Sequence, residues 1–247
     1  MHYLDHAATT PVPEEVARAM LAVLTERFGN PSAQYALGRE AKALVDQSRS
    51  TLAGSLGARP EQVVFTSCGT EGDNWAIRAA LCQNRRVGKH IVTTAVEHSA
   101  VLQCVKQLER EGYAVSYVTP DREGRITARS VLEAVREDTA LVSVMLVNNE
   151  TGAVFPVPEI AAGLKNRPAL LHTDAVQGFL KIPFTVKSLG ADYVTLSAHK
   201  IGGPKGIGAL YIGGRAKNTL PLLYGGGQEN GLRPGTEATA QMAGFAR

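Results

Sequence analysis

Polar and nucleophilic side chains gather in short segments that directly follow apolar runs of the chain. These segments span residues 67–74, 97–98, 148–152, 173–177 and 197–200. In open α/β sheets, ligands bind beyond the carboxyl ends of the strands. If the apolar runs are strands, the segments therefore meet at one edge of a sheet and form one site.

The segment 67–74, Ser-Cys-Gly-Thr-Glu-Gly-Asp-Asn, joins a predicted strand to a predicted helix. Small residues let backbone N–H groups converge there, and a helix N-terminus favours an anion, so a phosphate could bind. The segment has neither the P-loop nor the Gly-x-Gly-x-x-Gly pattern. A tight turn with Thr70 as a helix N-cap is the alternative, and local sequence alone favours it.

Lys200 and Asp174 are the charged candidates for cofactor chemistry. A lysine in a Gly-rich loop can form a Schiff base with a carbonyl cofactor if its surroundings lower its pKa. Lys205 competes for that role, and a solvated loop lysine is the alternative for either. Asp174 follows an apolar strand at once and could pair with the protonated ring nitrogen of a pyridine cofactor. A helix N-cap is the other interpretation of Asp174.

His98 and Asn149 are candidates for weaker contacts. The flat imidazole of His98 could lie against a ring, although a capping or surface role is commoner for a single histidine. Asn149 could donate a hydrogen bond to a cofactor oxygen, and an Asn-rich turn explains it equally well.

The three cysteines indicate neither a zinc cluster nor a disulfide framework. Cys82 and Cys104 lie within helical patterns and are expected in the core or on a helix face. Cys68 lies near a helix N-terminus, which would lower its thiol pKa. A residue in a phosphate cradle is nevertheless badly placed to attack a substrate.

The elements that must position these residues alternate between strands and helices. Apolar runs predict strands at 62–66, 90–94, 114–118, 141–146, 169–173, 193–196 and 208–212. Helical periodicity follows Pro13 and recurs at about 35–56, 71–83, 99–111 and 128–136, with a further helix beginning near Thr236. This alternation predicts an α/β fold with a mainly parallel sheet covered on both faces.

Composition excludes several other classes. The 247 residues are 44% hydrophobic, with 26 Lys+Arg against 23 Asp+Glu and a net charge of +3. That balance is typical of a globular domain and is no footprint of nucleic-acid binding. No apolar run approaches the roughly 18–20 residues of a membrane span. No signal peptide is visible, so we expect a cytoplasmic protein.

Collinear motifs across the whole chain resemble the class V aminotransferase family, and specifically the cysteine desulfurases. They are YLDHAATTP (3–11), FGNPS (28–32), FTSCGTEGDN (65–74), EHSAVL (97–102), NNETG (148–152), HTDAVQ (172–177), SAHK (197–200), GGGQE (225–229) and RPGTE (233–237). The resemblance implies the large domain of a fold-type I enzyme that carries pyridoxal 5′-phosphate.

Each candidate residue gains a role from this resemblance. Lys200, rather than Lys205, matches the lysine that holds the cofactor. Asp174 matches the partner of the pyridine nitrogen, and Gln177 matches the contact on the side of the ring hydroxyl. His98 matches the residue that stacks on the ring and acts as an acid/base, and Asn149 matches a contact to the substrate or the cofactor. Thr70, Ser197 and His199 match phosphate ligands. Thr236 matches a phosphate contact that the other subunit of a homodimer provides.

The implied reaction converts L-cysteine to L-alanine and leaves the sulfur on an enzyme cysteine as a persulfide. The sulfur would then pass to an acceptor or scaffold protein for iron–sulfur cluster assembly or tRNA thiolation. Alternatives within the family are a selenocysteine lyase, another C–S lyase and a transaminase. An alternative of another class is a non-catalytic scaffold for dimerisation or sulfur relay.

The resemblance also predicts a domain division. Residues 1–15 would belong to a small domain, and residues 16–247 would form the cofactor-binding large domain. The C-terminal part of the small domain, with the sulfur-accepting cysteine and the arginine that binds the substrate carboxylate, is expected to be absent from these 247 residues. Asn230 stands where many relatives carry arginine, a modest departure near the expected dimer interface.

Overall fold

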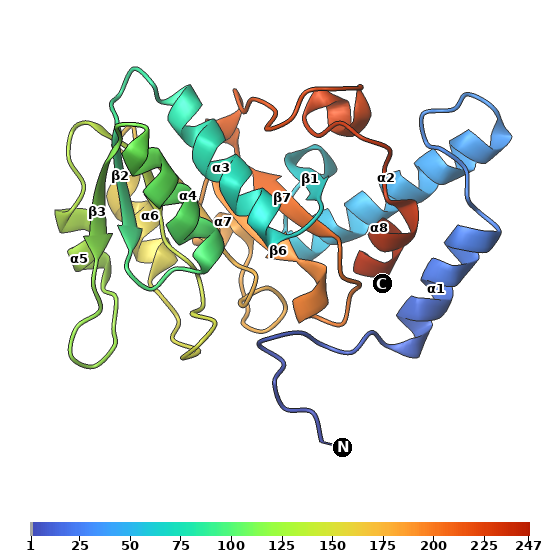
Figure 1. The fold of residues 1–247 in the computed structure, drawn as a ribbon, viewed down its shortest axis with the longest axis horizontal. Helices are drawn as coiled ribbons and strands as arrows, with labels where there is room; N and C mark the ends of the chain where they lie inside the picture. Colours follow the sequence, from blue (N-terminus) through green and yellow to red (C-terminus); the bar gives the residue numbers. More distant parts are fainter. Residues whose placement is uncertain (1) are drawn as a thin grey trace.

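A seven-stranded sheet forms the centre of the computed structural model, which describes residues 2–247 (Figure 1). Its strand order is β1-β7-β6-β5-β4-β2-β3, and only β7 runs antiparallel to its neighbours. The strands are β1 (Val63–Thr66), β2 (His90–Thr94), β3 (Ala114–Val118), β4 (Thr139–Ser143), β5 (Leu170–Asp174), β6 (Tyr193–Ser197) and β7 (Gly208–Ile212).

Helices cover both faces of this sheet. They are α1 (Glu14–Thr25), α2 (Ala36–Leu56), α3 (Gly69–Gln83), α4 (Ser99–Arg110), α5 (Ala128–Glu133), α6 (Val157–Leu164), α7 (Val186–Leu189) and α8 (Thr239–Phe245). Helices α3 and α4 share one core cluster with the sheet, and α2, α5, α6, α7 and α8 share the other. Successive strand residues alternate between the two clusters, as Val63, Val64 and Phe65 do, because side chains of a strand point to opposite faces.

This architecture confirms the predicted α/β class with a mainly parallel sheet. Each predicted strand is present, although β4 begins and ends earlier than the predicted 141–146. Helix α3 begins at Gly69, two residues before its predicted start, and α8 begins three residues after Thr236. The short helices α6 and α7 were not predicted, because α7 has only four residues and prolines flank the start of α6.

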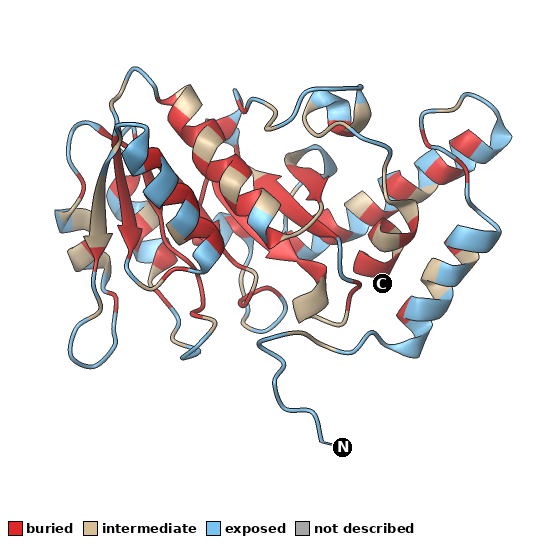
Figure 2. Ribbon diagram, in the orientation of Figure 1, coloured by how far each residue is buried: buried red, intermediate tan, exposed pale blue. Residues whose placement is uncertain are grey.

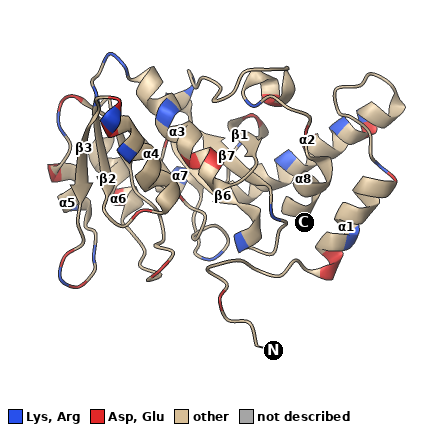
Figure 3. Ribbon diagram, in the orientation of Figure 1, with Lys and Arg blue, Asp and Glu red and all other residues tan. Residues whose placement is uncertain are grey.

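Burial follows the layers of the fold, whereas charged residues do not gather on one element. The strands at the middle of the sheet are buried, whereas the N-terminal segment before α1 is largely exposed (Figure 2). Acidic and basic residues are scattered over helices and loops (Figure 3). Among the described residues, no helix combines the length and the apolar character needed to cross a membrane.

Candidate functional site

A cavity of about 420 Å³ lies beyond the carboxyl ends of β1, β2, β4, β5 and β6. Every predicted site residue except Thr236 lines it: Thr70, His98, Asn149, Asp174, Gln177, Ser197, His199 and Lys200. Thr236 is exposed and lies outside this lining. The structure therefore brings together residues that are up to 130 positions apart, as the position of the polar segments predicted.

One end of the cavity is suited to an anion. The first turn of α3 opens into it at Gly69 and Thr70, and the N-cap residue Cys68 makes no side-chain capping bond. The N–H groups of an uncapped helix start carry partial positive charge. A Cβ atom at Gly69 would lie 2.9 Å from Cγ2 of Val176, so glycine is what allows this helix start to approach the loop after β5.

Basic groups add to the positive potential at this end. The pKa of His199 lies below its usual value because of burial and then because of the charges of Lys200, Lys205 and Lys181. Glu71, although in the first turn of α3, is directed away: it accepts from the Ser67 amide at 2.8 Å and from Arg233 at 3.0 Å. The carboxylate in the first turn is thus paired elsewhere.

The other end of the cavity carries buried acids. Oδ1 of Asp174 accepts a hydrogen bond from the Val176 amide at 2.9 Å. Burial, and then the neighbouring Asp73, raises the pKa of Asp174 to about 7. A carboxylate oxygen of each aspartate and a ring nitrogen of His98 all lie within 4.8 Å of one another. Nδ1 of His98 accepts from the Ala100 amide at 3.1 Å, so a neutral His98 carries its hydrogen on Nε2.

Lys200 is held by the N-terminal segment. Its Nζ atom donates to the backbone oxygens of Ala7 and Ala8, the latter at 2.8 Å. Gln177 donates to the same Ala7 oxygen at 2.8 Å. Burial lowers the pKa of Lys200, whereas the charges of Asp174 and Asp5 oppose this shift. A lowered pKa favours the neutral amine, which is the nucleophilic form.

The positions of the side chains decide between the alternatives that the sequence left open for the lysine and the asparagine. Lys205 is exposed and is not among the lining residues, whereas Lys200 is. Asn148 is buried and accepts bonds from the Glu150 and Thr151 amides, which makes it the turn-forming asparagine, and Asn149 lines the cavity. The turn and the candidate contact are therefore two different asparagines.

The cysteines lie where the helical patterns placed them. Cys82 is half-buried in α3, and Cys104 is buried in α4, where burial raises the pKa of its thiol to about 11. Cys68 lines the cavity beside Gly69. The thiol of Cys104 is thus poorly suited to act as a nucleophile.

Sequence reasoning missed several groups of the site. Asp73 was part of the predicted phosphate cradle but lies among the buried acids. Glu97 lies in one of the predicted polar segments but was given no role there. It is buried and accepts a hydrogen bond from the Met145 amide, and burial raises its pKa to about 8. The backbone oxygens of Ala7 and Ala8 had no signal in residue type, because any residue offers a carbonyl group.

Comparisons with known proteins agree with this geometry. The family model "Aminotransferase class-V" matches residues 2–246. The chain therefore belongs to the class V aminotransferase family, whose pyridoxal-phosphate enzymes have the fold-type I architecture seen here.

Individual relatives are cysteine desulfurases by name. The chain is 47% identical to "Cysteine desulfurase 2" of Trichormus variabilis, over 99% of this chain and 61% of that protein. It is 44% identical to "Cysteine desulfurase IscS" of Methanosarcina thermophila, over 99% of this chain and 60% of that protein. The chain thus spans about three fifths of the length of these curated relatives.

Solved structures show the same likeness. A "NifS-like protein" superposes with a TM-score of 0.95 at 40% identity, over 99% of this chain and 67% of that one. "SspA in complex with cysteine" superposes with a TM-score of 0.95 at 39% identity, over all of this chain and 71% of that one.

Proposed function

We propose that this chain is the pyridoxal 5′-phosphate-binding part of a cysteine desulfurase. The observation that carries the proposal is the convergence on one cavity of a lysine amine, a buried carboxylate and an uncapped helix N-terminus. These are the three groups needed for the aldehyde, the pyridine nitrogen and the phosphate of that cofactor. The names of the relatives support the cysteine substrate.

The described residues fit the cofactor group by group. The first turn of α3, with Thr70, Ser197 and His199, would bind the phosphate. Asp174 would accept from a protonated pyridine nitrogen, and that positive charge would offset the cost of burying the carboxylate. When bound, pyridoxal phosphate supplies an electron-withdrawing ring that stabilises negative charge at the substrate Cα.

The protein side chains then bind the ring and move protons. Lys200 supplies the amine for covalent attachment and, once the substrate amine replaces it, a base near Cα. His98 presents Nε2 as a donor, because its Nδ1 atom is engaged by the Ala100 amide. Gln177 and Asn149 line the same cavity and offer amide groups for cofactor or substrate oxygens.

The reaction that these groups would serve is the transfer of sulfur from L-cysteine to an enzyme thiol, which yields L-alanine and an enzyme persulfide. Only a thiolate is a good nucleophile for this step. The buried thiol of Cys104 does not meet this requirement. Cys68 lies in the proposed phosphate cradle, where it is badly placed to attack the substrate. As the resemblance implies, we expect the sulfur-accepting cysteine in a C-terminal part of the enzyme, beyond the three fifths of the relatives' length that this chain spans.

Reconstitution with pyridoxal phosphate tests the proposal. The chain is expected to show the visible absorption band of a lysine-linked cofactor, and Lys200→Ala is expected to abolish it. Lys205→Ala is the matched control, because Lys205 is exposed in the same loop and is expected to leave the band intact. A band that survives Lys200→Ala, or the absence of a band in the unaltered chain, would contradict the proposal.

Product analysis tests the reaction. With L-cysteine and a C-terminal half supplied in trans, alanine and persulfide are expected, whereas pyruvate and sulfide would indicate a different C–S lyase. The homodimer with Thr236 at the partner's phosphate, the small-domain assignment of residues 1–15, the sulfur acceptor and the cytoplasmic location stay predictions.

A further inference from the structure

Two carboxyl groups, not one, lie at the floor of the cavity. Asp73 on α3 is 1% exposed and Asp174 on β5 is 6% exposed, and a carboxylate oxygen of one lies within 4.8 Å of a carboxylate oxygen of the other. Two buried carboxylates at this separation repel each other strongly, because water does not screen them. The proposed function gives a role to Asp174 alone, which leaves Asp73 to be explained.

No cation of the described residues neutralises Asp73. The nearest basic group is Nε2 of His172, 3.4 Å from Oδ1 of Asp73. His172 is buried between two hydroxyl groups, with Nδ1 2.8 Å from Oγ of Ser143 and Nε2 3.0 Å from Oγ1 of Thr195. Burial lowers the pKa of His172 to about 4, so the imidazole is neutral at pH 7.

The other groups around Asp73 do not offset a negative charge on its carboxyl group either. Lys200 forms no ion pair with Asp73, and its Nζ atom donates instead to the Ala7 and Ala8 carbonyl oxygens. The titratable groups that face Asp73 from the neighbouring elements are Glu97, His98, Cys104, His172, Asp174 and Lys200. Glu97, Cys104 and His172 are neutral at pH 7 and so do not offset a negative charge on Asp73, and an ionised Asp174 opposes that charge.

Hydrogen bonds distinguish the two aspartates. Asp174 accepts from the Val176 amide at 2.9 Å, which favours its ionised form. Oδ1 of Asp73 is buried and has no hydrogen-bond partner, and the Thr195 hydroxyl favours the ionised form of Asp73 less strongly than burial disfavours it. A pyridine nitrogen brings one positive charge, which can match one carboxylate and not two.

We propose that Asp73 holds a proton on its carboxyl group and thereby leaves Asp174 as the one ionised carboxylate in the floor of the cavity. Asp73 is then a positioning residue: it acts through the charge state of Asp174 and does not itself bind the cofactor. This inference rests on the proposed function for the identity of the group that Asp174 binds. The proton on Asp73 can be tested without the cofactor.

The first test uses the cofactor-free chain and the isosteric variant Asp73→Asn, which mimics a neutral Asp73. In infrared spectra at pH 6, one component of the C=O stretch of protonated carboxyl groups is expected to be lost in Asp73→Asn, while the components of the protonated Asp174 and Glu97 remain. Thermal unfolding is expected to be little changed in the variant at pH 4, where an unfolded aspartate is itself about half protonated. At pH 9, where Asp73 must ionise in the unaltered chain, the variant is expected to unfold about 5 °C higher. Asp46→Asn, which alters an exposed carboxylate on α2, is the control and is expected to change neither signal.

The second test measures pyridoxal phosphate binding. Asp174→Asn is expected to weaken binding about 10- to 100-fold, the loss of a hydrogen bond to a charged group, and to alter the absorption band of the bound cofactor. Asp73→Asn is expected to stay within about threefold of the unaltered chain, since a neutral group replaces a neutral group.

The outcomes separate the two proposals. An infrared spectrum that is unchanged in Asp73→Asn, a large loss of thermal stability at pH 4, or binding weakened as much as in Asp174→Asn would each overturn the role of Asp73. Failure of the unaltered chain to bind pyridoxal phosphate would overturn the proposed function, and the infrared and unfolding data would still decide whether Asp73 holds a proton.

Discussion

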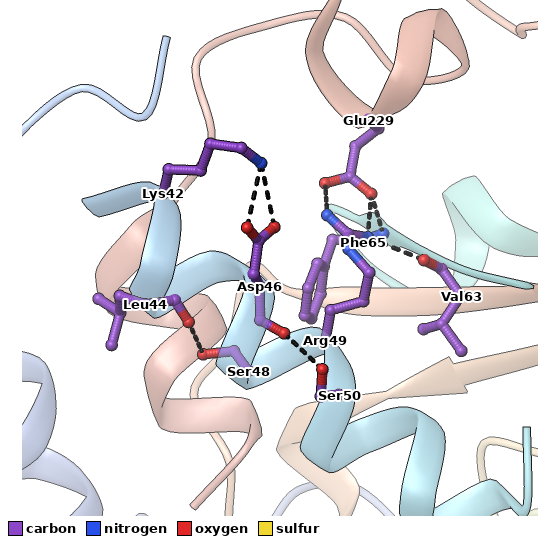
Figure 4. Close-up of polar contacts among 9 residues, drawn as sticks. All are labelled: Lys42, Leu44, Asp46, Ser48, Arg49, Ser50, Val63, Phe65 and Glu229. Atoms are coloured by element: carbon purple, nitrogen blue, oxygen red, sulfur yellow. Dashed lines mark hydrogen bonds and ion pairs between the residues drawn. The ribbon is translucent and has the colours of Figure 1, made fainter. Parts of the chain in front are cut away.

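Two buried acids of this chain are treated in opposite ways. Glu229 forms a bidentate ion pair with Arg49 at 2.6 Å and also accepts from the Phe65 amide at 2.9 Å (Figure 4). Asp73 has a buried oxygen without a hydrogen-bond partner and lies beside Asp174. Glu229, which holds the fold together, is fully paired, whereas Asp73 has no partner for its buried oxygen and, on our proposal, keeps a proton instead.

The Glu229 pair anchors the loop between β7 and α8. Arg49 on α2 also donates to the Val63 oxygen at 2.8 Å and lies 5.1 Å from the centroid of the Phe65 ring. Glu229 has a positive φ of 49°, which is costly for a residue with a side chain. The ion pair supplies the interactions that keep this backbone conformation in place.

Breaking this pair is expected to have the largest effect on stability. Glu229→Ala leaves the largely buried Arg49 without a charged partner, and the free energy of unfolding should fall by about 3–5 kcal/mol. Urea unfolding of the cofactor-free chain measures this loss. The double variant Arg49→Met/Glu229→Gln should recover part of it, because no uncompensated charge then remains. A loss below about 1 kcal/mol in Glu229→Ala would show that the buried pair is not what stabilises this loop.

The unpaired acids predict that the stability of the fold depends on pH, because they are buried without a counter-charge. Burial raises the pKa values of Asp73 and Asp174 to about 7 and of Glu97 to about 8, so the folded chain binds more protons than the unfolded chain above pH 4. The contribution of these groups to stability is therefore full below about pH 4 and is lost as the pH rises from there through 7 to 8. His172, with its pKa lowered to about 4, acts in the opposite direction below about pH 6.5.

The window from pH 6.5 to 8 reports mainly on the carboxyl groups, since an unfolded histidine is about half neutral at pH 6.5 and almost fully neutral at pH 8, so His172 contributes only about 0.4 kcal/mol in the opposite direction. The melting temperature of the cofactor-free chain is expected to fall by about 5 °C across this window and to change little at slightly higher pH. Thermal unfolding followed by circular dichroism measures it. A melting temperature that rises between pH 6.5 and 8 would show that these acids ionise normally in the folded chain.

The same contrast explains what the sequence could predict. Strands and long helices were predictable because their apolar periodicity is local, and the site followed because strand ends of a parallel sheet meet at one edge. Asp73 was not recognised, because its partners His172 and Asp174 lie about 100 residues away and its burial depends on the packing of α3 on β5. The hydrogen bonds from Lys200 to the Ala7 and Ala8 oxygens could not be predicted either, since every residue has a backbone carbonyl group.

The segment before α1 offers a smaller test at the cavity. Oγ1 of Thr10 donates to the His199 oxygen at 2.9 Å and accepts from the Gly202 amide at 2.7 Å. Thr10→Val keeps the shape and removes both bonds, and it is expected to lower the free energy of unfolding by about 1–2 kcal/mol. Limited proteolysis should show earlier cleavage near residues 5–10. Unchanged cleavage would mean that the remaining backbone bond, from the Thr10 amide to His199, is enough to hold the segment.

The smallest effect is expected at Lys42, about two helical turns from Arg49 on α2 (Figure 4). Lys42 donates to both carboxylate oxygens of Asp46, at 3.1 and 3.2 Å, and both side chains are more than half exposed. Water screens this pair and ordering two long side chains costs entropy, so Lys42→Ala should change the free energy of unfolding by less than about 0.5 kcal/mol. Urea unfolding beside Glu229→Ala compares an exposed pair with a buried pair on the same helix. If the two losses were similar, burial would not be what distinguishes Glu229, and the contrast with the unpaired acids of the cavity would need another cause.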